Sequence, residues 1–389
     1  LSVNQSIGRP LQTWVCFAVV VVAGLFGGIE RAHADGVERI LFIRAEFTNA
    51  PMPMTHDVWL NELIGVKEAA ETFFVRNSYG RIAGYDADYT PVLTLPGVST
   101  DYIGDIALIT YAMLDAARDA GFDVDAYDHQ VLSYPGVLNQ NFGAAALPGR
   151  VWLPGEYPWA PGFIHEMGHS YNVGHAGAIE GNGVPYPGVY REGRDGLFVM
   201  GSDDGDMYQM PLPMKYTIGW VDDQHIVDID SGNYGTYRIY AFDRDTLPEA
   251  KTLGLRFEAD GRTFWISFAP GLAQLYDEHG GAVWEEGVIV QMQDFSRTFL
   301  LDFTPGSQGE GDSADWIDTR DGALTLGMTY TFPNGGPIIR PIAVGETDGW
   351  KWIEVRVIPE PATAAILMLT GAVLLTGRPS SRRGDLGHA

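Results

Sequence analysis

The feature that most limits how this chain can fold is a set of three histidines in one short segment, His165, His169 and His175. Residues four apart lie one turn from each other on the same face of a helix, so the imidazoles of His165 and His169 can reach a single metal ion. His175 comes six residues after His169 and cannot lie on that face. The helix must therefore end soon after His169, and the chain must turn so that His175 approaches the same point from another side.

The residues between His169 and His175 suit such a turn. Asn172 is the non-glycine residue type that best tolerates a left-handed backbone, and Gly174 adds conformational freedom. Three nitrogen ligands leave a fourth position open for water, which is the arrangement of a catalytic zinc site. The sequence therefore predicts that His165, His169 and His175 bind Zn²⁺.

Glu166 directly follows the first of these histidines, and its side chain points to one side of the metal rather than straight at it. Its carboxylate can hold the attacking water and accept its proton, which is the role of a general base. The alternative is a helix that merely carries surface histidines. The apolar residues that lead into the motif argue against this alternative, because they would bury it: Trp159, Pro161, Phe163 and Ile164.

The composition is that of a globular protein with an acidic surface. Its 389 residues, 46% hydrophobic and 19% charged, suffice for two domains of roughly 150 residues each. Asp and Glu total 50 against 25 Lys and Arg, so a polyanion would be repelled and no nucleic-acid partner is expected. The single cysteine, Cys16, lies in an N-terminal apolar run, which excludes disulfides and a cysteine-based zinc site from the mature chain.

The N-terminus has the pattern of a secretory signal peptide. Arg9 precedes an apolar run over residues 14–26, and Ala32-His33-Ala34 places small residues at the two positions that a signal peptidase reads. We therefore expect residues 1–34 to be removed before Asp35. The apolar run is short for a membrane span, and an uncleaved N-terminal anchor is the alternative.

The C-terminus, residues 358–389, carries a second address signal. Pro359-Glu360-Pro361 precede an apolar stretch over residues 362–377, and three arginines follow it: Arg378, Arg382 and Arg383. An apolar stretch that ends in positive charge is typical of a stop-transfer element whose basic end stays in the cytoplasm. A simple membrane anchor is one interpretation.

The order of these three parts resembles the PEP-CTERM sorting signal of Gram-negative bacteria. This resemblance implies that a sorting enzyme in the membrane recognises the tail and removes it during export. The protein would then be anchored transiently and would end at the cell surface or in the extracellular matrix.

Hydrophobic periodicity divides the middle of the chain into two regions. Residues 35–226 combine strands with helices, the helices being expected over 59–76, 105–120 and 161–172. The strands of this region are expected over 38–48, 81–95, 131–138 and 149–153. Over residues 227–357 short strands with turn residues dominate, as in an all-β sandwich.

The spacing around the histidines is similar to the metzincin pattern His-Glu-x-x-His-x-x-Gly-x-x-His, with Asn172 in place of the glycine. Metzincins also have a Met-turn beneath the zinc, and Met200, followed by Gly201, comes at a suitable distance after His175. The later segments Met214-Lys215-Tyr216 and Gly219-Trp220 resemble those of gametolysin-like peptidases, as does Phe73-Phe74 with Asn77-Ser78-Tyr79-Gly80. The likeness covers roughly residues 38–295.

This resemblance implies an α+β metzincin-like catalytic domain at residues 35–226, with a mixed sheet and an active-site helix, followed by an all-β sandwich-like module at 227–357. It implies a secreted or surface-sorted zinc endopeptidase that acts on a protein or peptide, with Glu166 as general base and Met200 as support. The strand over 150–154 would be the edge strand that pairs with an extended substrate; an ordinary edge strand blunted by Pro154 is the alternative.

The chain departs from the family two residues after the Met-turn methionine, where Ser202 stands instead of the tyrosine ligand that some metzincins use. A donor to the oxyanion must then come from elsewhere. Tyr171 and Tyr208 are candidates, and packing is the alternative role for both.

Two acidic groups make Ca²⁺ a second candidate cofactor, because calcium prefers carboxylate oxygen. Neither has EF-hand spacing, and solvated loops are the alternative. One group is Asp203, Asp204 and Asp206, and the other is Glu310, Asp312, Asp315, Asp318 and Asp321.

Two rival functions remain open. One is a zinc-containing but non-proteolytic surface protein whose β module binds glycan or protein, although a purely structural site has no need of Glu166. The aromatic residues that support this rival are Trp265, Trp284, Trp316, Trp350 and Trp352. The other is a zinc hydrolase that acts on a non-peptide amide or ester.

Overall fold

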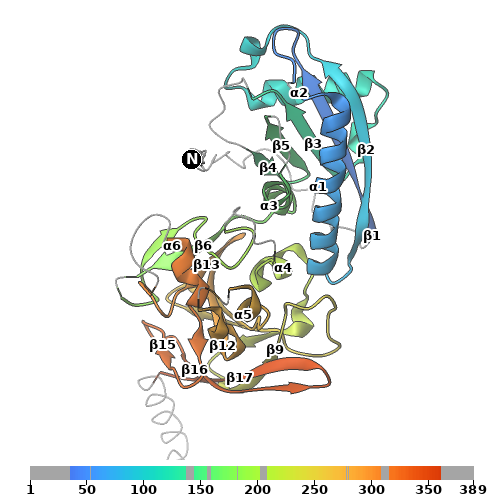
Figure 1. Cartoon of the computed structure of the whole chain (residues 1–389). Coiled ribbons are helices and arrows are strands. Elements are labelled where there is room, and N and C mark those ends of the chain that lie inside the picture. The colour runs from blue at the N-terminus through green and yellow to red at the C-terminus, as the bar shows by residue number, and fades with distance from the viewer. Residues whose placement is uncertain are drawn as a thin grey trace, which may run out of the picture. The chain divides into compact units, whose positions relative to one another are not determined.

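The computed structural model describes residues 36–52, 54–136, 144–155, 159–181, 183–201, 208–276, 278, 280–307 and 315–360 (Figure 1). Contacts divide the chain into two compact units. The first unit contains residues 36–176, Leu197–Val221 and Arg244–Leu247; the second contains Gly177–Gly196, Asp222–Asp243 and the chain from Pro248 onwards. This division differs from a single boundary after residue 226, because residues 177–196 pack with the later strands.

The first unit is built on a five-stranded sheet with the order β2-β1-β3-β5-β4. β1, β2, β3 and β5 are parallel to their neighbours, whereas β4 pairs antiparallel with β5. Their bounds are Gly36–Glu46 for β1, Ile82–Thr94 for β2, His129–Tyr134 for β3, Ala145–Leu147 for β4 and Arg150–Pro154 for β5. The prediction that residues 150–154 form the edge strand is wrong, because β4 pairs with the outer side of β5 and is itself the edge.

Helices cover both faces of this sheet. Phe42 of β1 contacts Phe163 of α3 (Ala160–Ser170), with ring centroids 5.9 Å apart, and the neighbouring Arg44 lies over Trp59 of α1 (His56–Asn77). The alternate residues Leu41 and Ile43 are buried in a cluster with Ile109 and Met113 of α2 (Ile106–Asp119). Since successive side chains of a strand point to opposite faces, α1 and α3 cover one face of the sheet and α2 covers the other.

Local capping explains where these helices begin and end. The side chain of Thr55 accepts a hydrogen bond from Val58 N at the start of α1, and Asp105 accepts one from Leu108 N at the start of α2. A fourth helix, α4 (Leu212–Ile218), ends at Gly219, whose φ of 88° is the left-handed conformation that glycine adopts without strain.

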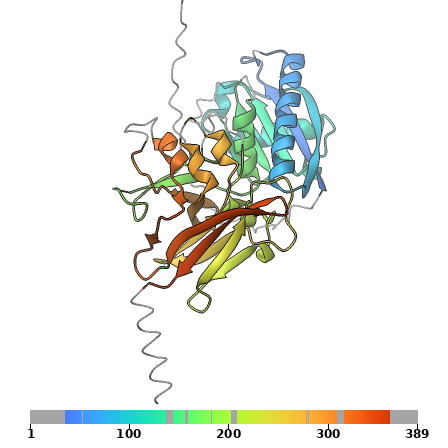
Figure 2. The same cartoon turned by 60° about the horizontal axis from the view of Figure 1, so that its bottom comes forward.

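The second unit consists of two sheets. The larger has the order β7-β6-β13-β12-β11-β10-β8, with β14 also paired to β12, and the smaller has the order β15-β16-β17-β9. The red arrows in the foreground of Figure 2 are strands β16 and β17 of the smaller sheet. Strands of the larger sheet are β6 (Ala176–Glu180), β7 (Val189–Arg191), β8 (Ile226–Ile229), β10 (Gly254–Ala259), β11 (Arg262–Ser267), β12 (Gly287–Asp294), β13 (Arg297–Leu301) and β14 (Leu324–Thr325). Those of the smaller sheet are β9 (Gly235–Tyr240), β15 (Tyr330–Thr331), β16 (Ile338–Thr347) and β17 (Trp350–Ile358). Two short α-helices, α5 (Leu272–Leu275) and α6 (Asp315–Asp318), also lie in this unit.

Both sheets of the second unit contribute to one buried apolar cluster. Leu255, Ile266 and Val290 enter it from the larger sheet, and Ile239 and Ile353 enter it from the smaller one. Two sheets that share a core form a sandwich-like arrangement. The coarse prediction of an α+β domain and a β module is thereby confirmed.

Both predicted address signals fall at the ends of the chain. The signal peptide, residues 1–34, and residues 361–389 of the sorting segment lie outside the described residues. Among the residues that are described, no helix combines the length and apolarity that crossing a membrane requires.

Candidate metal centre

The three predicted histidines come together in the first unit. One ring nitrogen from each of His165, His169 and His175 lies within 4.8 Å of the others, and Nε2 of His169 is 3.2 Å from Nε2 of His175. Two nitrogens bound tetrahedrally to zinc at about 2.0–2.1 Å would be about 3.3 Å apart. The donor set therefore fits a metal ion, as the sequence predicted.

Backbone carbonyls orient two of the imidazoles. Nδ1 of His165 is 2.8 Å from the carbonyl oxygen of Val199, and Nδ1 of His169 is 2.8 Å from that of Val173. A carbonyl can only accept, so Nδ1 of each ring must carry the hydrogen. The lone pair is then on Nε2, which is the tautomer that can bind a metal through that atom.

Burial keeps His165 in its ligand form. Desolvation lowers its pKa well below the ordinary histidine value, and the neighbouring His169 and His175 lower this pKa further. The hydrogen bond with Val199 acts in the opposite direction but does not outweigh them. Since only a neutral imidazole binds a metal ion, this shift favours binding near neutral pH.

The chain reverses after α3 in the predicted way. Tyr171 N donates to the carbonyl of Met167, Asn172 adopts a left-handed φ of 67°, and Val173 N reaches back to Gly168 O. This tight turn allows His175 to approach His169 from outside the helix. Asn172 therefore permits this reversal, because asparagine tolerates the left-handed conformation.

Met200 lies directly against α3. It is fully buried, and a Cβ added at Gly168 would be 2.3 Å from its sulfur. The carbonyl of Met200 also accepts a hydrogen bond from Ala176 N, next to His175. Glu166 is largely buried on the same helix, beside His165. The lead-in is only partly buried: Phe163 and Ile164 are enclosed, whereas Trp159 is exposed.

For neither Tyr171 nor Tyr208, the two candidate oxyanion donors, does a described contact direct the hydroxyl towards the histidines. Tyr171 is buried, and its hydroxyl donates to the carboxylate of Glu38. The ring of Tyr208 lies under the guanidinium of Arg76, 4.9 Å from the ring centroid. Sequence reasoning missed Glu38 and the two carbonyls of Val199 and Val173, because no local pattern marks them.

The predicted calcium ligands give a different result. Asp203, Asp204, Asp206, Glu310 and Asp312, and the side chain of Asp315, lie outside what the structure describes. Asp318 accepts hydrogen bonds from Gly306 N and Ser307 Oγ, and Asp321 accepts from Thr304 and Ser307. Among the described residues, the three histidines alone form a group of three or more His, Cys, Asp or Glu side chains able to share an ion.

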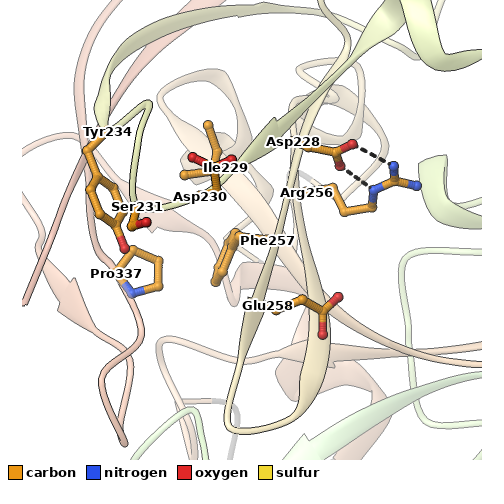
Figure 3. Close-up of a pocket in the computed structure, with 9 residues that line it drawn as sticks. All are labelled: Asp228, Ile229, Asp230, Ser231, Tyr234, Arg256, Phe257, Glu258 and Pro337. Carbon is orange, nitrogen blue, oxygen red and sulfur yellow. Dashed lines mark hydrogen bonds and ion pairs between the residues drawn. The ribbon is translucent and has the colours of Figure 1, made fainter.

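The second unit has a surface hollow of about 310 Å³ beside β8 and β10 (Figure 3). Arg256 donates to both carboxylate oxygens of Asp228, at 2.5 and 2.9 Å, and this pairing lowers the pKa of Asp228. Asp230 and Glu258 also line the hollow, so its lining is acidic overall. Of the tryptophans that suggested glycan binding, Trp265 and Trp284 are buried. Trp352 packs its ring under the guanidinium of Arg238.

Comparisons with known proteins add little. No family model matches the chain, and no curated protein matches it. A solved structure described as a chaperone–substrate complex shares 10% identity over 44% of this chain and 28% of that chain, with a TM-score of 0.27. Similarity this small carries no argument about fold or function.

Proposed function

We propose that this chain is a zinc-dependent endopeptidase of the metzincin type, exported and sorted to the surface or matrix of a Gram-negative-type bacterium. One observation carries the proposal: three imidazole nitrogens converge beside Glu166 while Met200 packs against the same helix. A purely structural zinc site would need a fourth protein ligand and no adjacent carboxylate.

The residues of the chain divide the chemistry among them. A zinc ion held by the histidines would polarise the scissile carbonyl and lower the pKa of a water molecule. Glu166 accepts the proton of the attacking water at its carboxylate and delivers it to the leaving nitrogen. The edge strand β4 offers backbone groups with which an extended peptide can pair, which suits an endopeptidase.

The rival function, a zinc-containing but non-proteolytic protein whose β module binds glycan, has weaker support. Two of its five tryptophans are buried, so their faces cannot stack on a sugar ring. The other rival, hydrolysis of a non-peptide amide or ester, would use the same histidine-bearing helix. Only its substrate distinguishes it from the proposed endopeptidase.

The test is hydrolysis of casein and of small esters by the mature exported protein, with metal analysis, beside Glu166→Gln. We expect about one zinc per chain in both proteins and casein cleavage by the wild type alone. Cleavage of esters without cleavage of casein would support the second rival. A wild type that holds zinc and cleaves neither substrate would support the binding protein.

A further inference from the structure

A buried network of hydrogen bonds ties the end of α3 to three strands of the first unit. His129 of β3 joins Ser170 Oγ through Nδ1, at 2.7 Å, and Glu38 of β1 through Nε2, at 2.9 Å. The hydroxyl of Tyr171 donates to the same Glu38 oxygen, at 2.5 Å, and lies 2.6 Å from the hydroxyl of Tyr85 in β2. All five side chains are buried.

The direction of the bonds follows from the number of protons. Because Tyr171 uses its one hydroxyl proton on Glu38, it must accept from Tyr85. Burial raises the pKa of Tyr85 well above the ordinary value, so its hydroxyl keeps the proton that it donates to Tyr171. Two donors, Tyr171 and His129, thus meet one carboxylate oxygen.

The composition is that of a Ser–His–carboxylate triad, but the geometry excludes nucleophilic catalysis. Ser170 is 1% exposed and His129 is fully buried, so no substrate can reach the serine. The ring nitrogens are also used in the opposite sense to a hydrolase triad, with the carboxylate on Nε2 rather than Nδ1. The network must act through what it holds.

What it holds is the part of the chain that sets the metal geometry. Ser170 and Tyr171 follow His169 directly and precede the turn to His175. The carbonyl of Ser170 also accepts from Gly149 N, next to β5. The three-histidine spacing itself leaves positions 170 and 171 unspecified, so these contacts are additional to the motif.

We propose that Glu38 and His129 are positioning residues that hold Ser170 and Tyr171 and thereby fix His169 and His175 for metal binding. This inference rests on the metal centre of the proposed function. Partners behind metal ligands typically change metal affinity by about 10–100-fold when removed. An indirect effect through the helix end should lie near the lower limit.

The test measures zinc affinity by competition with a chromophoric chelator, in the full exported protein, for Glu38→Gln, His129→Gln and Tyr85→Phe. We expect the first two to weaken zinc binding by about 10-fold and the third by about 2-fold. Tyr85→Phe removes only the outermost bond, so it keeps the test decisive if the larger changes prevent folding.

The matched control is Thr110→Val, which removes the buried hydrogen bond between Trp152 Nε1 and Thr110 on the α2 face of the same sheet. It should lower the melting temperature of the metal-free protein while zinc affinity stays unchanged. The inference is overturned if the network variants also lose only melting temperature and keep wild-type affinity.

These affinities decide the inference separately from peptidase activity. A wild type that binds zinc but cleaves no peptide would contradict the proposed function, and the affinities of the variants would still test the positioning role. A wild type without zinc affinity would overturn both.

Discussion

The first and second units each gather ionisable side chains, and the two groups behave in opposite ways. In the metal centre, His165 and His169 direct their outer N–H groups at the carbonyls of Val199 and Val173, so their lone pairs face each other. In the second unit, the carboxylates of Asp302, Asp318 and Asp321 accept hydrogen bonds from Thr304, Ser307 and Gly306. The Nε2 atoms of the two histidines are thus turned away from these carbonyls, whereas the three carboxylates accept hydrogen bonds from neighbouring residues.

Burial has the same physical effect in both places but opposite chemical consequences. It disfavours the charged form of any group. For His165 this lowers the pKa and leaves a neutral imidazole, which is a ligand. For Asp302 it raises the pKa to about 7, so the carboxyl is about half protonated at neutral pH. Single substitutions in either unit can test this contrast.

The largest effect is expected at Glu166. Replacing it with glutamine removes the proton acceptor and leaves the three histidines in place. General-base catalysis typically contributes about 10²–10⁴-fold, so kcat/KM for casein should fall by about 10³-fold while zinc content stays at the wild-type level. Kinetics and metal analysis on the same preparation provide the measurement. Equal loss of zinc and activity would mean that Glu166 supports the metal rather than the reaction.

A second test uses the pH dependence of stability at Asp302. Its pKa in the folded protein, about 7, lies above the ordinary 3.8, so the folded state binds the proton more tightly than the unfolded chain. This contribution is present below pH 4 and is lost as pH rises to about 7, with an upper limit of about 4 kcal/mol at 1.36 kcal/mol per pKa unit. Asp302→Asn should remove this pH-dependent loss of stability, because an amide does not titrate in this range. Its oxygen can still accept the hydrogen bond from Thr304.

Denaturant unfolding of both proteins between pH 4 and pH 7.5 measures this difference. The stability of Asp302→Asn relative to the wild type should increase with pH, and a constant difference would show that the carboxyl titrates normally. Repeating the series with calcium tests the predicted calcium binding, since an ion on these carboxylates would stabilise the wild type selectively at neutral pH.

Metal removal should separate the two groups of residues. A ligand at 100 times its Kd stabilises the folded state by about 2.7 kcal/mol, so adding zinc to the metal-free protein should raise its melting temperature. His169→Ala should abolish this rise, whereas Asp318→Asn should leave it intact. A zinc-dependent rise that survives in His169→Ala would place the ion elsewhere.

The grouping of the three histidines could be predicted from the sequence because their spacing is a local property. Helical periodicity places His165 beside His169, and asparagine at position 172 is suited to the left-handed turn that the structure contains. The partners that orient the site could not be predicted in this way. Glu38 and Val199 lie far from the motif in sequence, and only the tertiary fold brings them to it.

The same distinction applies to the strands. β4 is the three-residue segment Ala-Ala-Leu, whose residues carry no strand signal of their own, and its pairing with β5 decides its conformation. β16 contains Pro341, which lowers the strand propensity of its segment, and the register with β17 shifts just after it. Because the sequence does not predict β4, the prediction of β5 as the edge strand of the sheet is wrong.

The smallest effect concerns the contact between Gly168 and Met200, and it tests whether Met200 supports the helix or only fills space. In Gly168→Ala the new Cβ would overlap Met200 Sδ, at a cost of about 1–3 kcal/mol in unfolding free energy for overpacking. The matched control is Gly65→Ala in α1, where nothing lies within 4 Å of an added Cβ and alanine should stabilise the helix by about 1 kcal/mol.

Met200→Ala alone should be destabilising because it opens a cavity. If the two residues are in direct contact, the double variant Gly168→Ala/Met200→Ala should be more stable than the sum of the single changes by about 1 kcal/mol. Additive free energies would mean that the helix has room to move away from Met200, and the methionine would then be filling the core rather than holding the helix that carries His169.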